Sequence, residues 1–188
     1  MMSSQGAMKL IILDRDGVIN EDSDDYIKSP EEWQPIPGSL KAMARLTQAG
    51  YRIVVATNQS GLARGLFDRK TLQRIHDKMN LAVASVGGKI EAIFFCPHRP
   101  EDHCDCRKPK PGLLRDIAAR FQTDLAGVPV VGDSLRDVQA AQAVGARPIL
   151  VRTGKGAMTV AQNPSLQGVA IYDDLAAAVD VLLQKPPK

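Results

Sequence analysis

The stretch Lys9-Leu10-Ile11-Ile12-Leu13-Asp14-Arg15-Asp16-Gly17-Val18 decides the fold of this chain. Its apolar run, residues 10–13, is short and bounded by polar residues, which predicts a buried β-strand. Two aspartates follow the run at once, and Gly17 permits a sharp departure from extended geometry there. Ligands of parallel sheets gather at the carboxyl ends of the strands, so these aspartates are the first candidates for a functional site.

Similar apolar runs recur along the chain and alternate with segments of helical periodicity. The predicted strands cover residues 10–13, 52–56, 92–95, 128–131 and 148–151, with a weaker sixth at 169–172. The predicted helices cover residues 40–47 before Gly50, residues 72–86, a segment after Pro111, residues 138–144 before Gly145, and a segment from Asp174. Strands that are apolar on both faces and joined by helices predict an α/β fold, with a parallel sheet covered on both faces.

Length and composition are those of an ordinary globular protein. With 188 residues, 44% of them hydrophobic and 24% charged, the chain fits a single domain over residues 1–188. The net charge of +3 is too slight to indicate a nucleic-acid partner. No apolar run approaches the roughly 20 residues of a membrane helix, and residues 1–7 lack a secretory pattern. We expect a cytoplasmic monomer without a nucleic-acid or membrane partner. We also expect residues 1–8 to form a disordered leader ahead of the folded domain.

Polar residues follow several of the predicted strands, where a parallel sheet would bring them to one edge. The first strand ends in Asp14 and Asp16, the second in Thr57, and the fourth in Asp133, while Lys108 follows the third. Three carboxylates form an oxygen-rich pocket that suits a hard cation such as Mg²⁺. A hydroxyl and an ammonium would bind a phosphate, and a metal-screened carboxylate can attack it as a nucleophile. Phosphoryl transfer through an aspartyl-phosphate is therefore the chemical hypothesis.

Each of these residues also has a plain structural explanation. An aspartate after a strand is commonly a turn or helix-cap residue, and Asp133-Ser134 would serve well as a helix cap. Thr57 and Ser60 could form turns, and Lys108 could be a solvated surface charge. Independent accidents would not all fall at the ends of consecutive strands, so the combination favours the functional interpretation.

Four motifs resemble those of the haloacid dehalogenase superfamily of phosphohydrolases. They are Asp14-x-Asp16-Gly17-Val18, Thr57-Asn58, Lys108-Pro109 and Gly132-Asp133-x₃-Asp137, and the resemblance covers roughly residues 9 to 184. Together the motifs are highly specific, although each alone is weak. The resemblance implies a Rossmann-like core with a small insertion at residues 17–38 and no large cap domain, which leaves the site open.

The same resemblance implies a role for each motif residue. Asp14 would be the nucleophile, and Asp16 the general acid that later activates water. Mg²⁺ would be held by Asp14, by the backbone carbonyl of Asp16 and by Asp133. Thr57 and Lys108 would stabilise the transferring phosphoryl group. Asp137 would help to position these residues without contacting the phosphoryl group itself.

A second metal motif lies between the third strand and Lys108. Cys96, His98, Cys104 and Cys106 offer nitrogen and sulfur ligands at a spacing that fits a tetrahedral structural zinc site. His103 is a rival to His98, but a residue adjacent to Cys104 is harder to aim at the same metal. The alternative is a reduced cysteine cluster without metal. A closed zinc site has no open position, so its expected task is to hold the segment that carries Arg107 and Lys108.

Within the superfamily, the zinc loop and the runs around Asn58 and Lys108 resemble heptose bisphosphate phosphatases of lipopolysaccharide synthesis. That resemblance implies a phosphorylated sugar as substrate, bound with help from Arg107. It places the remaining substrate-binding residues at Asp22, Ser23, Asp24, Asp25, Asn58, Gln59 and Ser60. The short stretch between His98 and Cys104 resembles histidinol-phosphate phosphatases instead, which rank second. A non-catalytic phospholigand-binding module is the alternative from another class, although three crowded carboxylates would repel an anionic ligand.

Overall fold

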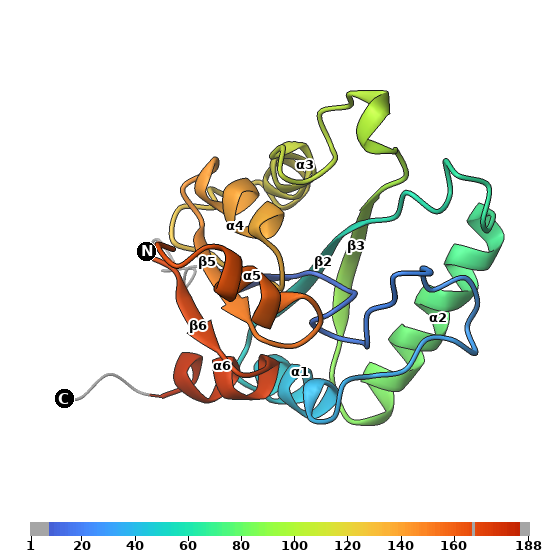
Figure 1. Cartoon of the computed structure of the whole chain (residues 1–188). Coiled ribbons are helices and arrows are strands. Elements are labelled where there is room, and N and C mark those ends of the chain that lie inside the picture. Colours follow the sequence, from blue (N-terminus) through green and yellow to red (C-terminus); the bar gives the residue numbers. More distant parts are fainter. Residues whose placement is uncertain (1–7, 167, 185–188) are drawn as a thin grey trace.

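The computed structural model describes residues 8–166 and 168–184. Of the predicted leader, residues 1–7 lie outside the described residues, and Met8 is 36% exposed. The described part of the chain forms one six-stranded sheet with helices on both faces (Figure 1). No helix in this part is long and apolar enough to cross a membrane.

All strands of the sheet run parallel, as predicted. They are β1 (Leu10–Leu13), β2 (Arg52–Asn58), β3 (Ile90–Cys96), β4 (Pro129–Gly132), β5 (Arg147–Val151) and β6 (Ala170–Tyr172). The spatial order is β3-β2-β1-β4-β5-β6. Leu13 is in register with Val55 of β2 and with Val131 of β4, so β1 is the central strand. The residues that follow β1 therefore emerge in the middle of the sheet edge.

Helices cover each face because side chains alternate along the strands. Ile11 and Leu13 belong to a core cluster with the apolar stripes of α1 (Ser39–Gln48), α2 (Arg69–Ser85) and α6 (Leu175–Leu182). Leu10 and Ile12 belong to a second cluster with α3 (Gly112–Phe121) and α4 (Leu135–Gln142). In Figure 1, α3 and α4 lie on the opposite side of the sheet from α1 and α2. The prediction of a sheet covered on both faces is thus confirmed.

Two short helical elements escaped the sequence patterns. Helix α5 (Gly156–Gln162) follows β5, and a 3₁₀ turn, η1 (Pro100–Asp102), lies between Cys96 and Cys104. Only Gly156 and Thr159 of α5 are buried, so the helix has no apolar stripe to reveal it. β3 also differs from expectation: six of its seven residues are only partly buried because it is an edge strand.

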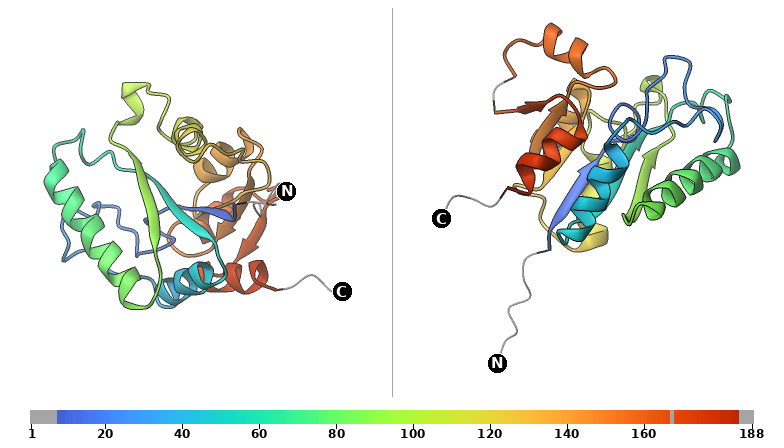
Figure 2. Two further views of the ribbon diagram at one scale, coloured as in Figure 1. Left: turned by 180° about the vertical axis from the view of Figure 1, so that it is seen from behind. Right: turned by 90° about the horizontal axis from the view of Figure 1, so that it is seen from below.

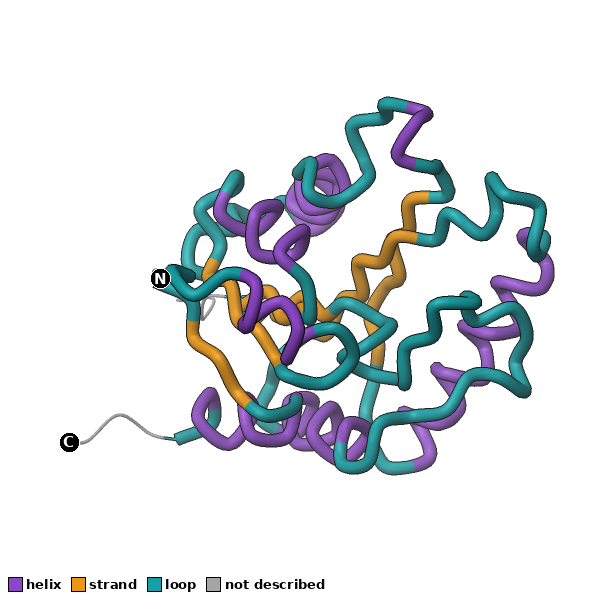
Figure 3. The backbone as a smooth tube through the Cα atoms, in the orientation of Figure 1, coloured by secondary structure: helices purple, strands orange, loops and turns teal. Residues whose placement is uncertain are grey.

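The insertion at residues 17–38, which we call the strap, contains no helix or strand of its own (Figure 3). It buries Ile19, Ile27 and Trp33 against the core instead. Lys78 on α2 fastens it by donating from Nζ to the carbonyl oxygens of Pro30 at 2.6 Å and Trp33 at 2.9 Å. The strap is therefore a packed segment beside the site, which agrees with the expected absence of a large cap at this place in the chain.

The strap, the loop after β2 and helix α5 lie at the same end of the sheet (Figure 2, right). This is the carboxyl end of the strands, since each of these segments follows a strand directly. The topology thus brings segments that are distant in sequence to one edge, where a ligand site is expected.

Candidate active site

A buried ion pair forms the centre of this edge. Nζ of Lys108 lies 3.0 Å from Oδ1 of Asp14 and 2.6 Å from Oδ1 of Asp137, and it also donates to the carbonyl oxygen of Ala56 at 2.8 Å. The side chain of Lys108 is only 5% exposed. Burial opposes its charge, but the two carboxylates outweigh that cost and raise the pKa of Lys108. Its ammonium is therefore fixed beside Asp14 as a permanent positive charge.

The backbone around Lys108 is held by Asn58. The amide oxygen of Asn58 accepts from the backbone N–H of Lys108 at 3.1 Å, and its Nδ2 donates to the carbonyl oxygen of Lys108 at 3.1 Å. This reciprocal pair ties the end of β2 to the segment after the zinc motif. Asn58 thus positions the lysine, in addition to lining the cavity described below.

Asp137 both caps a helix and holds the lysine. Its Oδ2 accepts from the backbone N–H of Ser134 at 3.1 Å and from the Ser134 hydroxyl at 2.6 Å, at the start of α4. Burial opposes ionisation of Asp137, but the charge of Lys108 and these hydrogen bonds lower its pKa. Of the predicted cap at Asp133-Ser134, the structure confirms Ser134, whose partner is Asp137, whereas the carboxylate of Asp133 accepts from the backbone of Lys155 instead.

Asp16 is surrounded by donors. Its Oδ1 accepts from Nε of Arg15 at 3.0 Å and from Nδ2 of Asn20 at 2.9 Å. Its Oδ2 accepts from Nη2 of Arg15 at 3.1 Å and from Nε2 of Gln59 at 2.9 Å. The same Gln59 nitrogen donates to Oγ1 of Thr57 at 2.9 Å, so Asp16 and Thr57 share a partner.

Asp133 lies against two glycines. Its Oδ2 accepts from the backbone N–H of Lys155 at 2.8 Å. A Cβ added to Gly17 or to Gly154 would collide with this carboxylate, and both glycines have positive φ, at +81° and +57°. Burial and the nearby charge of Asp137 raise the pKa of Asp133 to about 7. Only glycine allows the turns after β1 and β5 to approach the carboxylate this closely.

These residues surround a cavity of about 200 Å³. Its walls contain Asp14, Asp16, Asp22, Ser23, Asp24, Thr57, Asn58, Gln59, Ser60, Arg107, Lys108, Asp133 and Asp137, all of them named from the sequence. Asp25 is the exception: it is exposed and does not line the cavity, because the chain turns between Ser23 and Tyr26, whose φ is +66°. The structure thus brings together nearly the whole expected set.

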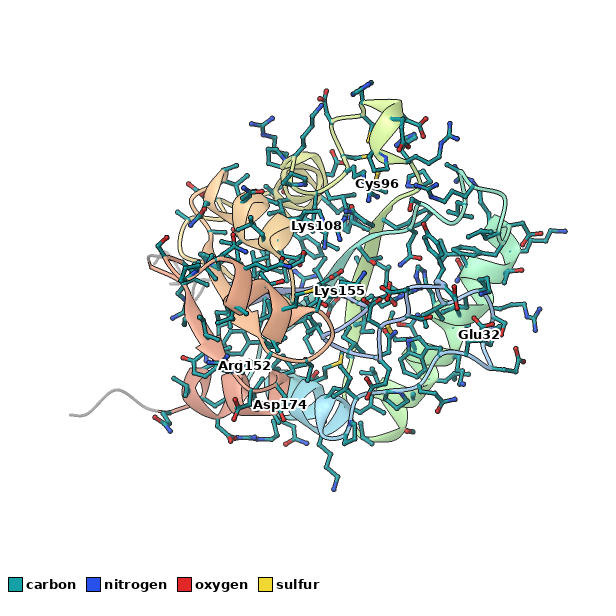
Figure 4. The ribbon with its side chains drawn as sticks, viewed as in Figure 1. Glu32, Cys96, Lys108, Arg152, Lys155 and Asp174 are labelled. Carbon is teal, nitrogen blue, oxygen red and sulfur yellow. The ribbon has the colours of Figure 1, made fainter. Side chains whose placement is uncertain are left out.

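Several residues of the cavity wall were missed in the sequence: Tyr26, Ile27, Ser134, Arg136 and Lys155. Lys155 matters most, since its Nζ lies 3.2 Å from Oδ1 of Asp24 and 3.6 Å from Oδ2 of Asp22 in the strap. It follows β5 in a turn with two glycines, Gly154 and Gly156, and that pattern after a strand was a usable signal. In Figure 4, Lys108 and Lys155 lie near the centre of the molecule.

The cysteine motif folds into a compact cluster above the cavity, where Figure 4 labels Cys96. Sγ of Cys96 lies 3.6 Å from Sγ of Cys104 and 3.0 Å from Sγ of Cys106, and Nδ1 of His98 lies 3.3 Å from Sγ of Cys106. All four ligand atoms lie within 4.8 Å of one another. Ligand sulfurs in a tetrahedral zinc site are about 3.8 Å apart, so the cluster fits one ion. His98 belongs to it and His103 does not.

Arg107 connects this cluster to the cavity. Its Nη1 donates to the backbone carbonyl oxygen of His98 at 3.2 Å, and its side chain lines the cavity. Gly112 closes the loop behind it by donating from its backbone N–H to the carbonyl oxygen of Asp105 at 3.0 Å. The order of the cysteine loop therefore sets the position of Arg107.

The donor set around Asp14 suits a magnesium ion. Carboxylate oxygens of Asp14, Asp133 and Asp137 lie within 4.8 Å of one another, and hard cations prefer such oxygen ligands. Burial and the neighbouring carboxylates raise the pKa of Asp14 well above its usual value despite Lys108. The single positive charge of Lys108 does not balance the three carboxylates, and a divalent cation would supply the additional positive charge. Asp137 is already engaged by Lys108 and by the hydroxyl and backbone of Ser134, so Asp14 and Asp133 are the carboxylates that could hold such an ion.

Two family models match the chain. The model described as polynucleotide kinase 3 phosphatase matches residues 9–141, and the model described as HAD-hydrolase-like matches residues 105–178. Both matches include Lys108 and Asp133, and the first also includes Asp14 and Asp16. The phosphohydrolase resemblance of the motifs is thereby confirmed.

Whole-chain relatives are more specific. A D-glycero-beta-D-manno-heptose-1,7-bisphosphate 7-phosphatase from Bordetella bronchiseptica is 62% identical over 178 residues, which cover 95% of this chain and 99% of the relative. An enzyme of the same name from Pseudomonas aeruginosa is 55% identical over 175 residues, covering 93% of this chain and 98% of the relative.

Solved structures agree with the sequence comparison. The crystal structure of D,D-heptose 1,7-bisphosphate phosphatase from B. bronchiseptica, complexed with magnesium and phosphate, superposes with a TM-score of 0.93 at 61% identity. The superposition covers 95% of this chain and 100% of the B. bronchiseptica chain. Near-complete coverage at this identity, together with the shared fold and the HAD-type motifs, shows that the chain belongs to the heptose-1,7-bisphosphate 7-phosphatase family of HAD-like hydrolases.

Proposed function

We propose that this chain is a magnesium-dependent phosphatase that removes the C7 phosphate of D-glycero-β-D-manno-heptose 1,7-bisphosphate. The observation that carries the proposal is the Asp14–Lys108 ion pair in a cavity lined by oxygen atoms, which Asp16 also lines. The names of the relatives supply the substrate, including the β anomer. We place the enzyme in the cytoplasm as a monomeric single domain without a nucleic-acid or membrane partner.

The reaction has two steps. In the first, a carboxylate oxygen of Asp14 attacks the phosphorus, the bond from phosphorus to the sugar oxygen breaks, and Asp16 gives that oxygen a proton. In the second, Asp16 takes a proton from water as the water oxygen attacks the phosphorus. The bond from phosphorus to Asp14 then breaks and inorganic phosphate leaves. Each proton and each bond is balanced over the cycle, and the enzyme returns to its starting state.

Positive charge on the phosphoryl group comes from two sources. Asp14, the backbone carbonyl of Asp16 and Asp133 would hold Mg²⁺, whose charge offsets the repulsion between Asp14 and the phosphate. Lys108 is already fixed 3.0 Å from Asp14 by Asp137, and Thr57 offers a hydroxyl on the same wall. Groups that need no rearrangement when charge develops are the most effective stabilisers of a transition state.

The sugar and its second phosphate would occupy the outer part of the cavity. Asp22, Ser23 and Asp24 of the strap offer acceptors for sugar hydroxyls, and Gln59 and Ser60 offer polar groups on the opposite loop. Arg107 and Arg136 supply the positive charge that a second phosphate needs. A monophosphate without this second charge would bind less tightly.

The cysteine cluster would hold a structural zinc ion. Its four ligands, Cys96, His98, Cys104 and Cys106, close a tetrahedron and leave no position for water or substrate. The ion would therefore order the loop that carries Arg107 and Lys108 and take no part in the reaction.

A comparison of substrates tests the proposal. With Mg²⁺ present, kcat/KM for the heptose 1,7-bisphosphate should exceed that for histidinol phosphate by at least about 100-fold, since the loss of charge-assisted contacts to a phosphate costs about 3 kcal/mol. A higher value for histidinol phosphate would identify the second-ranked phosphatase instead. Tight binding of the bisphosphate without release of phosphate would indicate a non-catalytic binding module.

A further inference from the structure

Arg15 stands between the two catalytic aspartates in sequence, yet it does not line the cavity. Its side chain is 0% exposed, which makes it one of the largest fully buried side chains of the described residues. A guanidinium stays ionised in proteins, and a buried charge without partners is strongly destabilising. The charge of Arg15 must therefore be balanced by buried partners, although Arg15 has no role in the two-step mechanism.

The guanidinium holds Asp16 on one side and a histidine on the other. Nε and Nη2 of Arg15 donate to Oδ1 and Oδ2 of Asp16 at 3.0 and 3.1 Å, a forked pair that fixes the plane of the carboxylate. The third nitrogen, Nη1, lies 3.3 Å from Nε2 of His76. Since arginine can only donate, Nε2 of His76 is the acceptor.

His76 is suited to accept this bond. It lies on α2 with 4% of its surface exposed, and its ring packs against Phe95 with 6.1 Å between the ring centres. Burial and the adjacent charge of Arg15 lower the pKa of His76 to about 4. The imidazole is therefore neutral near pH 7, with a lone pair on Nε2. Because α2 also fastens the strap through Lys78, the histidine comes from a firmly packed element.

The remaining donors to Asp16 come from loops. Asn20 belongs to the strap and Gln59 to the turn after β2. The path His76–Arg15–Asp16 is thus the contact that joins the carboxylate to a helix. General acid catalysis depends on the position of the proton donor, and a displacement of about 1 Å can cost about 100-fold in rate.

We infer that Arg15 and His76 are positioning residues for the general acid: His76 orients the guanidinium of Arg15, and the guanidinium orients the carboxylate of Asp16. The inference rests on the proposed function, in which Asp16 protonates the sugar oxygen. In the first step, Arg15 and His76 do not act on the substrate themselves and influence the reaction only by positioning Asp16. Its loss should therefore matter most where the leaving oxygen needs a proton.

Four variants test the inference. His76→Leu removes the acceptor, His76→Gln offers a new acceptor near the position of Nε2, and Arg15→Lys keeps the charge but loses the fork. Met79→Leu, a buried and volume-conserving change on the same helix, controls for packing of α2. Each variant is assayed as the Mg²⁺- and Zn²⁺-loaded enzyme in single-turnover experiments with the heptose bisphosphate and with nitrophenyl phosphate, whose leaving group needs no proton.

We expect His76→Leu and Arg15→Lys to slow leaving-group release from the sugar phosphate by about tenfold or more, with less than about a threefold effect on nitrophenyl phosphate. KM should change less than about twofold. His76→Gln should recover most of the rate, and Met79→Leu should match the wild type on both substrates. If His76→Leu fails to fold, Arg15→Lys makes the same comparison between the two substrates, with His76→Gln and Met79→Leu as controls.

Equal losses on the two substrates, or unchanged rates in His76→Leu and Arg15→Lys, would overturn the inference. Failure of the proposed function gives a different result, since the wild type would then not release phosphate from the heptose bisphosphate. In that case glycerol phosphate, another ester with a poor leaving group, replaces the heptose bisphosphate in the assay. The loss of rate of each variant on glycerol phosphate is then compared with its loss on nitrophenyl phosphate.

Discussion

Nζ of Lys108 lies 3.0 Å from Oδ1 of Asp14, so the cation and the nucleophile of the proposed reaction form a buried ion pair. The two residues follow different strands, and the parallel topology brings them together. Asp137 holds the lysine from its other side at 2.6 Å. The positive charge is thus in place before any phosphate arrives.

Replacement of the nucleophile is the first prediction. Asp14→Asn keeps the shape of the side chain but removes the attacking oxygen and a metal ligand, so kcat should fall by at least about 10³-fold, or about 4 kcal/mol of transition-state stabilisation. The fold should survive, because Lys108 keeps its contact with Asp137. Steady-state phosphate release and circular dichroism check both points. Retention of more than about a tenth of wild-type kcat would exclude the aspartyl-phosphate mechanism.

Replacement of the general acid is the second prediction. General acid catalysis contributes about 10²–10⁴-fold and matters most for a poor leaving group. Asp16→Asn should therefore lose far more activity on the sugar phosphate than on nitrophenyl phosphate in the phosphorylation step. Rapid-quench single-turnover measurements with both substrates make the comparison. Equal losses would remove Asp16 from the acid role.

The sequence predicted the parts of the molecule that depend on strand ends. Asp14 and Asp133 directly follow β1 and β4, Thr57 is at the end of β2, and Lys108 lies in the segment after β3. The parallel topology brings such residues to one edge of the sheet. The cysteine motif was equally readable, because its ligands are close in sequence and are drawn together by one short loop. Each prediction needed only local patterns and the known properties of parallel sheets.

Other contacts could not be read from the sequence because they join segments without a periodic pattern. The pairing of Lys155 with Asp22 and Asp24 depends on the path of the strap, which has no regular structure. His76 lies on a predicted helical segment, but nothing in its spacing reveals the guanidinium of Arg15 beside it. Such contacts follow from the packing of the strap and α2 around β1.

Loss of zinc is the third prediction. Cys104→Ser should lower the melting temperature and raise KM, because the loop that holds Arg107 would lose the zinc ion that we propose orders it. Mg²⁺ should still be required for the remaining activity, since Asp14 and Asp133 are untouched. Metal analysis of the purified wild type should find about one zinc per chain. A zinc-free preparation with unchanged stability and unchanged KM would contradict the proposal of a structural zinc site.

The pH dependence of stability is the fourth prediction. The pKa of His76 falls from 6.5 to about 4 on folding, because of burial and the charge of Arg15. The unfolded chain then binds more protons than the folded chain between these two values, so the free energy of unfolding should decrease as pH falls from 6.5 towards 4. The full effect is at most about 3 kcal/mol.

Urea unfolding of the wild type and of His76→Gln at pH 7 and pH 5 isolates this contribution, since the carboxylates are common to both proteins. The difference in unfolding free energy between the two pH values should be smaller in His76→Gln. An equal pH dependence in the two proteins would show that His76 is not held neutral in the folded state.

The most direct test of the account is the position of the phosphate that leaves. Phosphorus NMR of the heptose 1,7-bisphosphate, incubated with the enzyme and Mg²⁺, follows the two phosphates separately. We predict that the signal of the C7 phosphate is replaced by inorganic phosphate while the anomeric C1 phosphate persists, and that the Asp14→Asn variant leaves both signals intact. Loss of the C1 phosphate, or no release by the wild type, would contradict the account.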